Sequence, residues 1–98
     1  MKLVTVNVKF YGMLRTNFIK EVSRQFTLNQ GNVETLINAL IQHYGEELKE
    51  KFIDPETNQL TDRLVMFVNG TNVKNLQGPK TELKDDDLIA LFPPSGGG

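Results

Sequence analysis

The segment from residue 33 to residue 44 constrains the fold most, because it carries an unbroken apolar stripe with the spacing of one helix face. Its apolar side chains recur at i, i+3, i+4, i+7 and i+8: Val33, Leu36, Ile37, Leu40, Ile41 and Tyr44. Asn32 is a favourable N-cap, Glu34 suits the first turn, and Gly45 is a favourable C-terminal stop. A stripe of this width predicts a helix whose apolar side lies against a sheet.

Two strands are expected before this helix. Residues 4–10 alternate between apolar and polar, and the apolar members share one face: Val4, Val6, Val8 and Phe10. This period of two in β-branched residues is typical of a half-buried strand. A second strand is expected within residues 20–28, where one parity holds Val22, Phe26 and Leu28. Arg24 shares that parity, which predicts either a bulge or an edge position for this strand.

The second half of the chain predicts further strands. Residues 46–53 favour a short helical turn, and a polar loop follows them. Residues 64–68 (LVMFV) are apolar on both parities, as in a strand covered on both faces. The dipeptide Asn69-Gly70 favours a type I′ hairpin, with a short return strand near residues 72–74. Residues 88–92 (LIALF) form the last expected strand.

The order of these elements is a hairpin, a helix and then more strands, which indicates the α+β class. If the last strand pairs with the first, a mixed sheet of four to five strands forms with one main helix packed across it. This is the β-grasp arrangement, the architecture of ubiquitin. The 98 residues are expected to form one domain over residues 1–94, followed by a flexible glycine tail at residues 95–98.

Composition excludes several classes of function. The chain has 11 Lys and Arg against 12 Asp and Glu, so the net charge of −1 gives no reason to expect a nucleic-acid or membrane partner. The absence of cysteine excludes disulfides, thiolate catalysis and cysteine-ligated metals. No window approaches the roughly 20 apolar residues of a membrane span, and the alternating start is unlike a signal peptide. A cytoplasmic protein is expected.

The folded body shows no pattern that predicts catalysis. His43 is the only histidine and has no serine or carboxylate spaced to form a triad or a metal site, so it is interpreted as a solvent-facing helix residue. Residues 85–87 (DDD) could suggest a cation site, but their spacing fails that of an EF-hand loop. A tight turn, with Asp86 in an unusual backbone conformation, is the favoured interpretation. No glycine-rich phosphate loop is present.

The last seven residues (FPPSGGG) carry the one reactive group that is set apart from the sheet. The two prolines predict a stiff exit and the glycines a thin segment that a narrow channel can close around. The terminal carboxylate of Gly98 could therefore be carried into the active site of another protein. It would need activation there, most simply adenylation by ATP bound to that partner. A frayed terminus or an engineered glycine linker is the alternative interpretation.

The chain resembles the MoaD/ThiS family of ubiquitin-like sulfur carriers, and within it most closely MoaD, the small subunit of molybdopterin synthase. The segments that carry the resemblance are VKFYGMLR (residues 8–15), NVETLINAL (32–40), VNG (68–70) and LKDDDLIALFPPSGGG (83–98). The last segment is the most specific, because two prolines, two variable residues and two glycines follow the final strand. Asp86 stands where the family often has glycine, and Ser95 and Gly96 replace residues that are more often apolar or alanine.

The resemblance implies a function for the tail. In that family the terminal glycine, here Gly98, is adenylated by an ATP-using enzyme related to ubiquitin-activating enzymes and converted to a thiocarboxylate. The sulfur then goes to the pterin precursor held by the large molybdopterin synthase subunit. No cofactor or metal is expected on the chain itself. The residues expected to contact partners are Gly97, Gly96, Pro94, Pro93, Phe92, Val73 and Tyr11. For the last three, ordinary packing is the competing interpretation.

Two other functions remain open. Archaeal members of the family are joined through the terminal glycine to lysines of target proteins, so the chain could be a protein modifier. It could also be a ubiquitin-fold interaction module with an inert tail. The sequence does not distinguish a pterin from a tRNA base or a thiazole precursor as the sulfur acceptor. Because catalysis would take place in partner proteins, whether the chain counts as an enzyme also stays open.

Overall fold

The computed structural model describes residues 3–11, 21–57, 61 and 63–92. They form a five-stranded sheet with the strand order β2-β1-β5-β3-β4, together with two helices. The elements are β1 (Val4–Phe10), β2 (Ser23–Leu28), α1 (Val33–Tyr44), α2 (Glu46–Phe52), β3 (Val65–Val68), β4 (Thr71–Asn72) and β5 (Leu88–Phe92). Short 3-10 turns at Val73–Asn75 and Gly78–Lys80 join β4 to the segment before β5.

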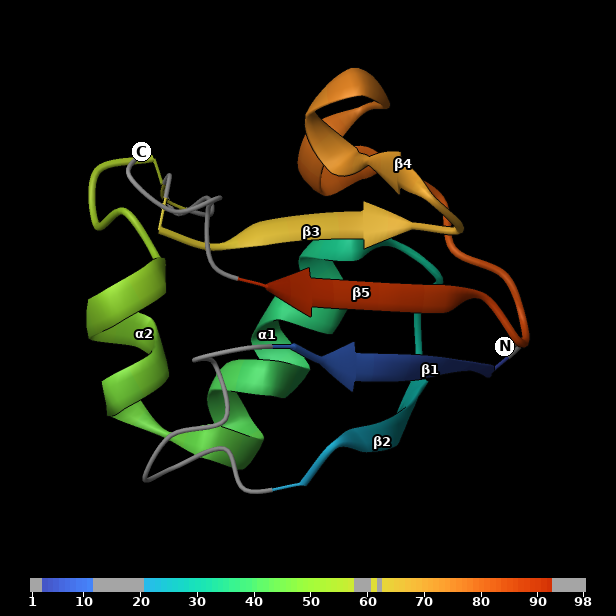
Figure 1. Cartoon of the computed structure of the whole chain (residues 1–98), viewed down its shortest axis with the longest axis horizontal. Helices are drawn as coiled ribbons and strands as arrows, with labels where there is room; N and C mark the ends of the chain where they lie inside the picture. Colours follow the sequence, from blue (N-terminus) through green and yellow to red (C-terminus); the bar gives the residue numbers. More distant parts are fainter. Residues whose placement is uncertain (1–2, 12–20, 58–60, 62, 93–98) are drawn as a thin grey trace.

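The first and last strands lie side by side at the centre of the sheet. β1 and β5 run parallel, with Asn7 opposite Leu88 and Phe10 opposite Leu91. β2 is antiparallel to β1, and β3 is antiparallel to β5. Figure 1 shows α1 behind the strands, packed across one face of the sheet. The expected α+β fold, a mixed β-grasp sheet with one main helix, is confirmed.

The ends of α1 confirm the caps predicted for it. The side chain of Asn32 accepts a hydrogen bond from the backbone N–H of Thr35 at 2.8 Å. At the other end Gly45 has a φ of 90°, and its N–H donates to the carbonyl of Ile41 at 2.7 Å. The buried face of the helix comprises Val33, Leu36, Ile37 and Leu40. These caps align that face with the sheet.

The core lies between α1 and the inward side chains of the central strands. Val4, Val6, Val8 and Phe10 alternate with more exposed residues along β1, as predicted. Ile89 and Leu91 extend the same buried layer onto β5. Burial of this apolar surface is the main stabilising contribution to the fold.

Gly31 lies where the chain enters α1 and makes a close backbone approach. Its carbonyl accepts a hydrogen bond from the N–H of Leu83 at 2.8 Å. A Cβ at this position would lie 2.5 Å from the Leu83 carbonyl oxygen. The neighbouring residues Asn32 and Glu82 form an isolated antiparallel bridge. The absence of a side chain at residue 31 therefore lets two loops lie directly against each other.

β2 is an edge strand without a bulge. Its register with β1 is continuous from Ser23 opposite Lys9 to Leu28 opposite Val4. The edge position inferred from Arg24 is confirmed, and the bulge is not found. Val22 was expected on the buried face, which is wrong: it precedes the strand and is 58% exposed, although its carbonyl still accepts from the N–H of Phe10.

β3 is covered fully on one face only. Met66 and Val68 are buried, whereas Val65 and Phe67 are half-buried. The expectation of coverage on both faces is therefore wrong, because α1 lies against one side of the sheet. The side chains of Val65 and Phe67, which point to the other side of β3, are therefore partly exposed to solvent.

The hairpin after β3 has the predicted turn. Asn69 and Gly70 have φ angles of 50° and 90°, and Val68 pairs with Thr71 across them, as in a type I′ turn. The return strand is shorter than expected and ends at Asn72. The side chain of Asn72 accepts a hydrogen bond from the N–H of Lys74 at 2.9 Å, which turns the chain into the following 3-10 segment.

Candidate functional site

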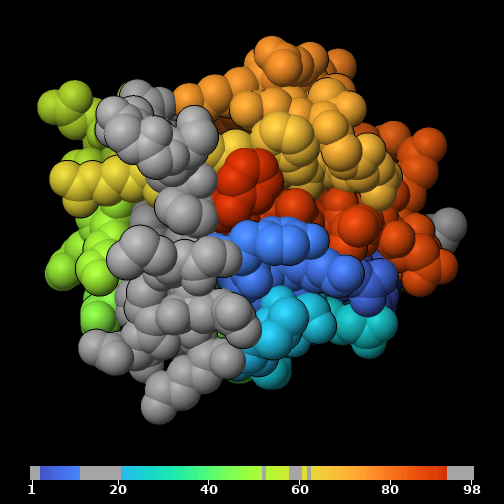
Figure 2. Space-filling view, in the orientation of Figure 1, coloured from blue at the N-terminus to red at the C-terminus, as the bar shows by residue number. Residues whose placement is uncertain are grey.

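The face of the sheet opposite α1, here called the open face, carries an apolar patch on β3 and β5. Successive side chains along a strand point to opposite faces of the sheet. The residues that alternate with the buried ones on β3 and β5 therefore point away from α1. Val65 lies opposite Phe92, and Phe67 lies opposite Ala90. The patch comprises Tyr11, Val65, Phe67, Leu88, Ala90 and Phe92. Figure 2 views this face, with β3 in yellow, β5 in red and β1 in blue.

Three aromatic rings meet in this patch. The ring of Phe92 lies 5.1 Å from that of Phe67 between centroids, at an angle of 51°. The ring of Tyr11 contacts Phe92 edge-on, at 6.3 Å and 85°. Tyr11 is 45% exposed, and Phe92 is half-buried. Aromatic rings that present one side to solvent are well suited to protein interfaces. Tyr11 and Phe92, both predicted to contact partners, are thus brought together.

The other half of the open face is polar. On β1 and β2 the Thr5 and Thr27 hydroxyls lie 3.0 Å apart, and the Gln25 amide donates to the Asn7 side-chain carbonyl at 2.9 Å. Lys9 is exposed on the same face. The apolar patch is therefore bordered by a hydrogen-bonded polar surface, the arrangement of an interface core with a polar rim.

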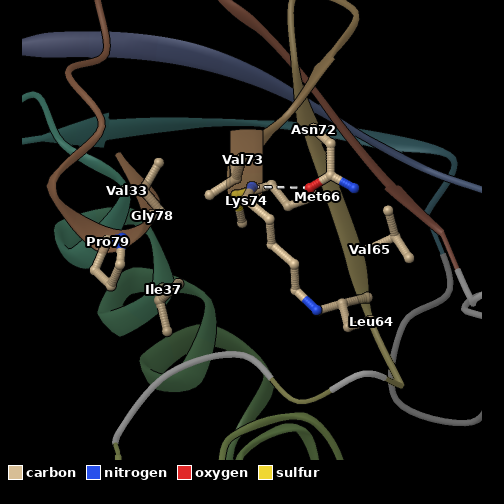
Figure 3. A pocket seen from close by; sticks show the side chains of 10 residues that line it. All are labelled: Val33, Ile37, Leu64, Val65, Met66, Asn72, Val73, Lys74, Gly78 and Pro79. Atoms are coloured by element: carbon tan, nitrogen blue, oxygen red, sulfur yellow. Dashed lines mark hydrogen bonds between the residues drawn. The ribbon is translucent and has the colours of Figure 1, made fainter. Parts of the chain in front are cut away.

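The structure does not bring Val73 to this patch. Asn72 lies opposite Phe67 on the open face, so the next residue turns toward the core, and Val73 is only 6% exposed. It lines an apolar cavity of about 90 Å³. Figure 3 shows this cavity, with Val33 and Ile37 of α1 on one side and the β3 segment on the other. Its role in contacting partners stays a prediction, separate from that of Tyr11 and Phe92.

The tail residues follow directly from the aromatic patch in the sequence. Phe92 ends β5. The predicted tail sites lie outside the described residues: Pro93, Pro94, Gly96, Gly97 and Gly98. Their roles, and the domain boundary after residue 94, stay predictions.

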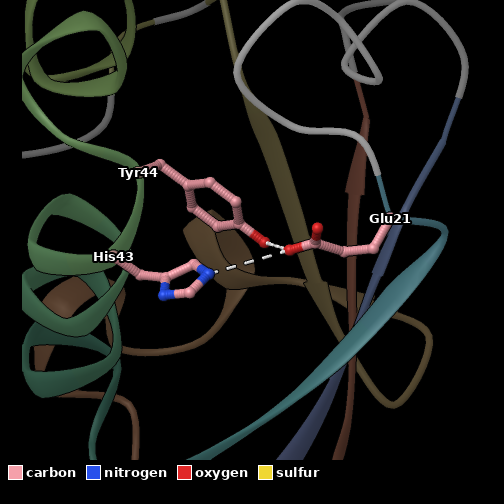
Figure 4. Close-up of polar contacts among 3 residues, drawn as sticks. All are labelled: Glu21, His43 and Tyr44. Atoms are coloured by element: carbon pink, nitrogen blue, oxygen red, sulfur yellow. Dashed lines mark hydrogen bonds and ion pairs between the residues drawn. The ribbon is translucent and has the colours of Figure 1, made fainter.

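A second polar group lies where β2 meets the end of α1. The Tyr44 hydroxyl donates a hydrogen bond to the Glu21 carboxylate, and the Nε2 of His43 lies 3.9 Å from the same carboxylate oxygen. Figure 4 shows both helix side chains directed at Glu21. The hydrogen bond from Tyr44 holds the pKa of Glu21 below its ordinary value. Burial, with the hydrogen bond to Glu21, raises the pKa of Tyr44.

This group fastens the segment that precedes β2 to the end of α1. His43 is partly exposed, as expected, but its neighbour Glu21 was not foreseen. The two residues are far apart in the sequence, and no local pattern links them. With its pKa raised, Tyr44 stays protonated at neutral pH and acts as a hydrogen-bond donor.

Residues 85–87 form the predicted turn. Asp86 has a φ of 70°, and its N–H donates to the Thr5 carbonyl at 2.8 Å. Asp85 accepts from the Thr5 N–H at 2.8 Å, and Asp87 accepts from the Lys84 N–H at 2.8 Å. The carboxylates of Asp85 and Asp87 are thus used in backbone hydrogen bonds. Among the described residues, no group of three or more His, Cys, Asp or Glu side chains is placed to hold a metal ion.

None of the helices in the described ranges has the length and apolar character needed to cross a membrane. This agrees with the sequence, in which no apolar window of that length is found.

The family profile of ThiS matches residues 8–98, which include the end of β1, all the later strands, α1 and the glycine tail. The chain belongs to the ThiS family. A predicted sulfur carrier protein of Archaeoglobus fulgidus is 32% identical to it over 81 residues, covering 74% of this chain and 90% of that protein. The resemblance inferred from the sequence, to ubiquitin-like sulfur carriers of the ThiS and MoaD type, is confirmed.

Solved structures place this ThiS-family chain among carriers and modifiers. Small archaeal modifier protein 1 of Methanosarcina acetivorans is 26% identical, with a TM-score of 0.80 and complete coverage of both chains. A predicted molybdopterin converting factor subunit 1 of Pyrococcus furiosus is 26% identical, with a TM-score of 0.73, over 93% of this chain and 98% of that one. CysO, solved in the BexX/CysO complex of Amycolatopsis orientalis, is 25% identical, with a TM-score of 0.75, over 95% and 99%.

Proposed function

We propose that this chain is the sulfur-carrying small subunit of molybdopterin synthase, with Gly98 as the residue that bears the sulfur. The observation that carries the proposal is the family match, which continues through the glycine tail to residue 98. The similarity to a predicted molybdopterin converting factor subunit supports a pterin as the sulfur acceptor.

The chemistry at Gly98 proceeds in two steps. A carboxylate is a poor electrophile, so one of its oxygens first attacks the α-phosphorus of ATP on the activating enzyme, and pyrophosphate leaves. A hydrosulfide-equivalent nucleophile then attacks the carbonyl carbon of the acyl adenylate and displaces AMP. The product is a thiocarboxylate, whose sulfur is a good nucleophile at neutral pH. ATP is bound by the activating enzyme, and the carrier needs no cofactor of its own.

The apolar patch of the open face is the surface on which partners would dock. Tyr11, Phe67 and Phe92 are the aromatic residues of the apolar patch. They meet where β5 ends, one residue before the first proline of the tail. A partner bound there is within reach of the tail. Gly96 and Gly97 carry no side chains, so a narrow channel can close around their backbone. CysO, another family member, has been solved in complex with BexX, which supports an enzyme partner of this kind.

Conjugation to proteins is the second candidate function. In that case the same acyl adenylate passes Gly98 to the amine of a target lysine, forming an isopeptide bond. The similarity to a small archaeal modifier protein over the full length of both chains favours this function. Both functions need an activated Gly98 and differ only in the nucleophile that takes the acyl group.

Mass spectrometry of the protein from its own cells tests the proposal. The C-terminal peptide is expected to carry one sulfur in place of one oxygen, and the purified thiocarboxylate is expected to convert a pterin precursor to a dithiolene with the large subunit. Deletion of Gly97 and Gly98 is the matched control and should abolish both signals. Branched peptides that join Gly98 to target lysines, without a thiocarboxylate, would replace the carrier function by the modifier function. A Gly98 that stays inert with ATP, activating enzyme and sulfur donor would overturn both.

A further inference from the structure

The outer edge of β2 carries backbone groups without a neighbouring strand. The N–H of Phe10 donates to the carbonyl of Val22, which fixes the phase of the antiparallel ladder. Every second residue from Val22 onward therefore pairs its backbone with β1. The backbone groups of the alternate residues point outward, away from the sheet: Ser23, Gln25 and Thr27. Because β2 ends the strand order, no other strand of the described residues lies against them.

A shallow groove, largely open to solvent, lies between this edge and one flank of α1. It has a volume of about 310 Å³ and is lined by β2 together with Ala39, Gln42 and His43. Phe26, which is 8% exposed, lies with the half-buried Ala39 at its base. A strand added beside β2 would direct every second side chain into this groove, since side chains alternate across a sheet.

Arg24 is the only lysine or arginine among the residues that line the groove. Arg24 lies at its rim, with the guanidinium carbon 5.9 Å from the centroid of the Phe26 ring. His43 lies on the helix side, and none of the lining residues is acidic. Glu21 lies beside the groove; its carboxylate accepts from Tyr44, faces His43 and also interacts electrostatically with Arg24. Because Arg24 is exposed, its guanidinium can also bind a carboxylate of a partner.

We propose that the β2 edge and the flank of α1 receive an extended, acidic segment of a partner protein, which joins the sheet as an added strand. Its backbone pairs with Ser23, Gln25 and Thr27, as in other cases of strand addition. One of its apolar side chains packs on Phe26 and Ala39, and a neighbouring carboxylate pairs with Arg24. Most of the apolar patch lies on β3 and β5, and β1 separates these strands from the β2 edge. The site does not depend on chemistry at Gly98.

A synthetic peptide tests the site on the full-length chain. The probe is a blocked peptide in which isoleucine and valine alternate with threonine, with two aspartates at each end. One control replaces the aspartates by lysines, and another methylates alternate backbone nitrogens. The acidic peptide should shift the amide resonances of Ser23, Gln25, Thr27 and Ala39. The lysine peptide should bind at least about tenfold more weakly. The methylated peptide should lose binding, because it cannot complete the strand pairing.

Substitutions distinguish binding in the groove from a general effect of the protein's charge on peptide binding. Arg24→Glu should raise the Kd of the acidic peptide by at least about tenfold. Lys80→Glu makes the same change of charge on the far 3-10 turn and should leave the Kd unchanged. Ala39→Gln fills the base of the groove and should weaken binding without altering the fold, which the amide spectrum of the free variant reports.

Four outcomes would overturn the proposal. They are no shift at millimolar peptide, shifts confined to Tyr11, Phe67 and Phe92, equal binding of the lysine peptide, or dimerisation of the chain through β2 in sedimentation experiments. The last would make a second copy the occupant of the edge. Each can be told apart from a failure at Gly98, since none of these measurements uses the tail.

Discussion

Phe92 packs against Phe67 with ring centroids 5.1 Å apart, and this contact ties the last residue of β5 to the neighbouring strand β3. Tyr11, which follows β1, contacts the same ring from the other side at 6.3 Å. Phe92 is thereby held between residues from both neighbours of β5. The residue from which the tail departs has a fixed position on the sheet.

Phe92→Ala should uncouple partner binding from the stability of the fold. Loss of a central aromatic side chain is expected to raise the Kd for the activating enzyme by at least about tenfold, as at other interface hot spots. The half-buried ring contributes about 1 kcal/mol through its aromatic contacts, so the variant should still fold. Calorimetric titration and urea unfolding measure the two effects. Leu76→Ala, which truncates an exposed apolar side chain outside the apolar patch, is the control and should bind normally.

Tyr44→Phe should produce a loss of stability that depends on pH. The hydrogen bond to Glu21 is expected to contribute about 1 kcal/mol at pH 7, because its acceptor is charged but partly exposed. The folded pKa of Glu21 lies below its ordinary value, so this contribution is present above about pH 4.3 and is lost as the pH falls through the folded pKa. The difference in the free energy of unfolding between the unsubstituted protein and the Tyr44→Phe variant should therefore become smaller as the pH falls toward 3.

Urea unfolding of both proteins between pH 3 and pH 7 measures that difference. Tyr11→Phe removes a hydroxyl from the open face and serves as the control, with an effect that should not change over this range. A Tyr44→Phe deficit of the same size at both pH values would show that Glu21 is not its partner in solution.

Asn32→Ala should destabilise the fold by about 1 kcal/mol, because it removes the acceptor for the Thr35 N–H at the start of α1. Asn38→Ala makes the same change at an exposed position in the middle of the helix. It should be neutral or slightly stabilising, since alanine is the better helix former. Chemical denaturation of the two variants measures both effects. Equal losses would contradict a capping role.

Gly31→Ala should destabilise the fold by about 2 kcal/mol, because the added Cβ would lie 2.5 Å from the Leu83 carbonyl and force two loops apart. Gly78→Ala is the contrasting change. Nothing lies within 4 Å of its Cβ position, and only the positive φ of 57° opposes the substitution. It should cost about 1 kcal/mol. A Gly31 variant no less stable than the Gly78 variant would argue against the close approach.

Most of the fold could be predicted from local patterns. The period of two in β1, the stripe of α1 with its caps, and the Asn69-Gly70 turn are each specified by neighbouring residues. Pairing of the last strand with the first followed from the order of elements. The first residue of β2 and the last residue of β4 could not be predicted from local sequence patterns. Val22 has the character of a strand residue but lies before β2, and the side chain of Asn72 ends β4 by a local hydrogen bond.

The candidate site was predicted less completely. Tyr11 and Phe92 were expected at a docking surface and lie together, while Phe67 was assigned to a buried strand because its neighbours are all apolar. Which parity of β3 faces the helix depends on register with β5, and the sequence of β3 alone does not set that register. The partnership of Glu21 and Tyr44 is likewise a product of the tertiary fold.

The central place of β5 also has a mechanical consequence. This strand is hydrogen-bonded on both flanks, to β1 in parallel and to β3 in antiparallel orientation. A pull applied beyond Phe92, along the axis of the strand, would load both rows of hydrogen bonds in shear rather than open them one at a time. An edge strand would peel away from its single neighbour under the same force. The sheet should therefore stay folded under a pulling force on the C-terminal tail that would be enough to detach an edge strand.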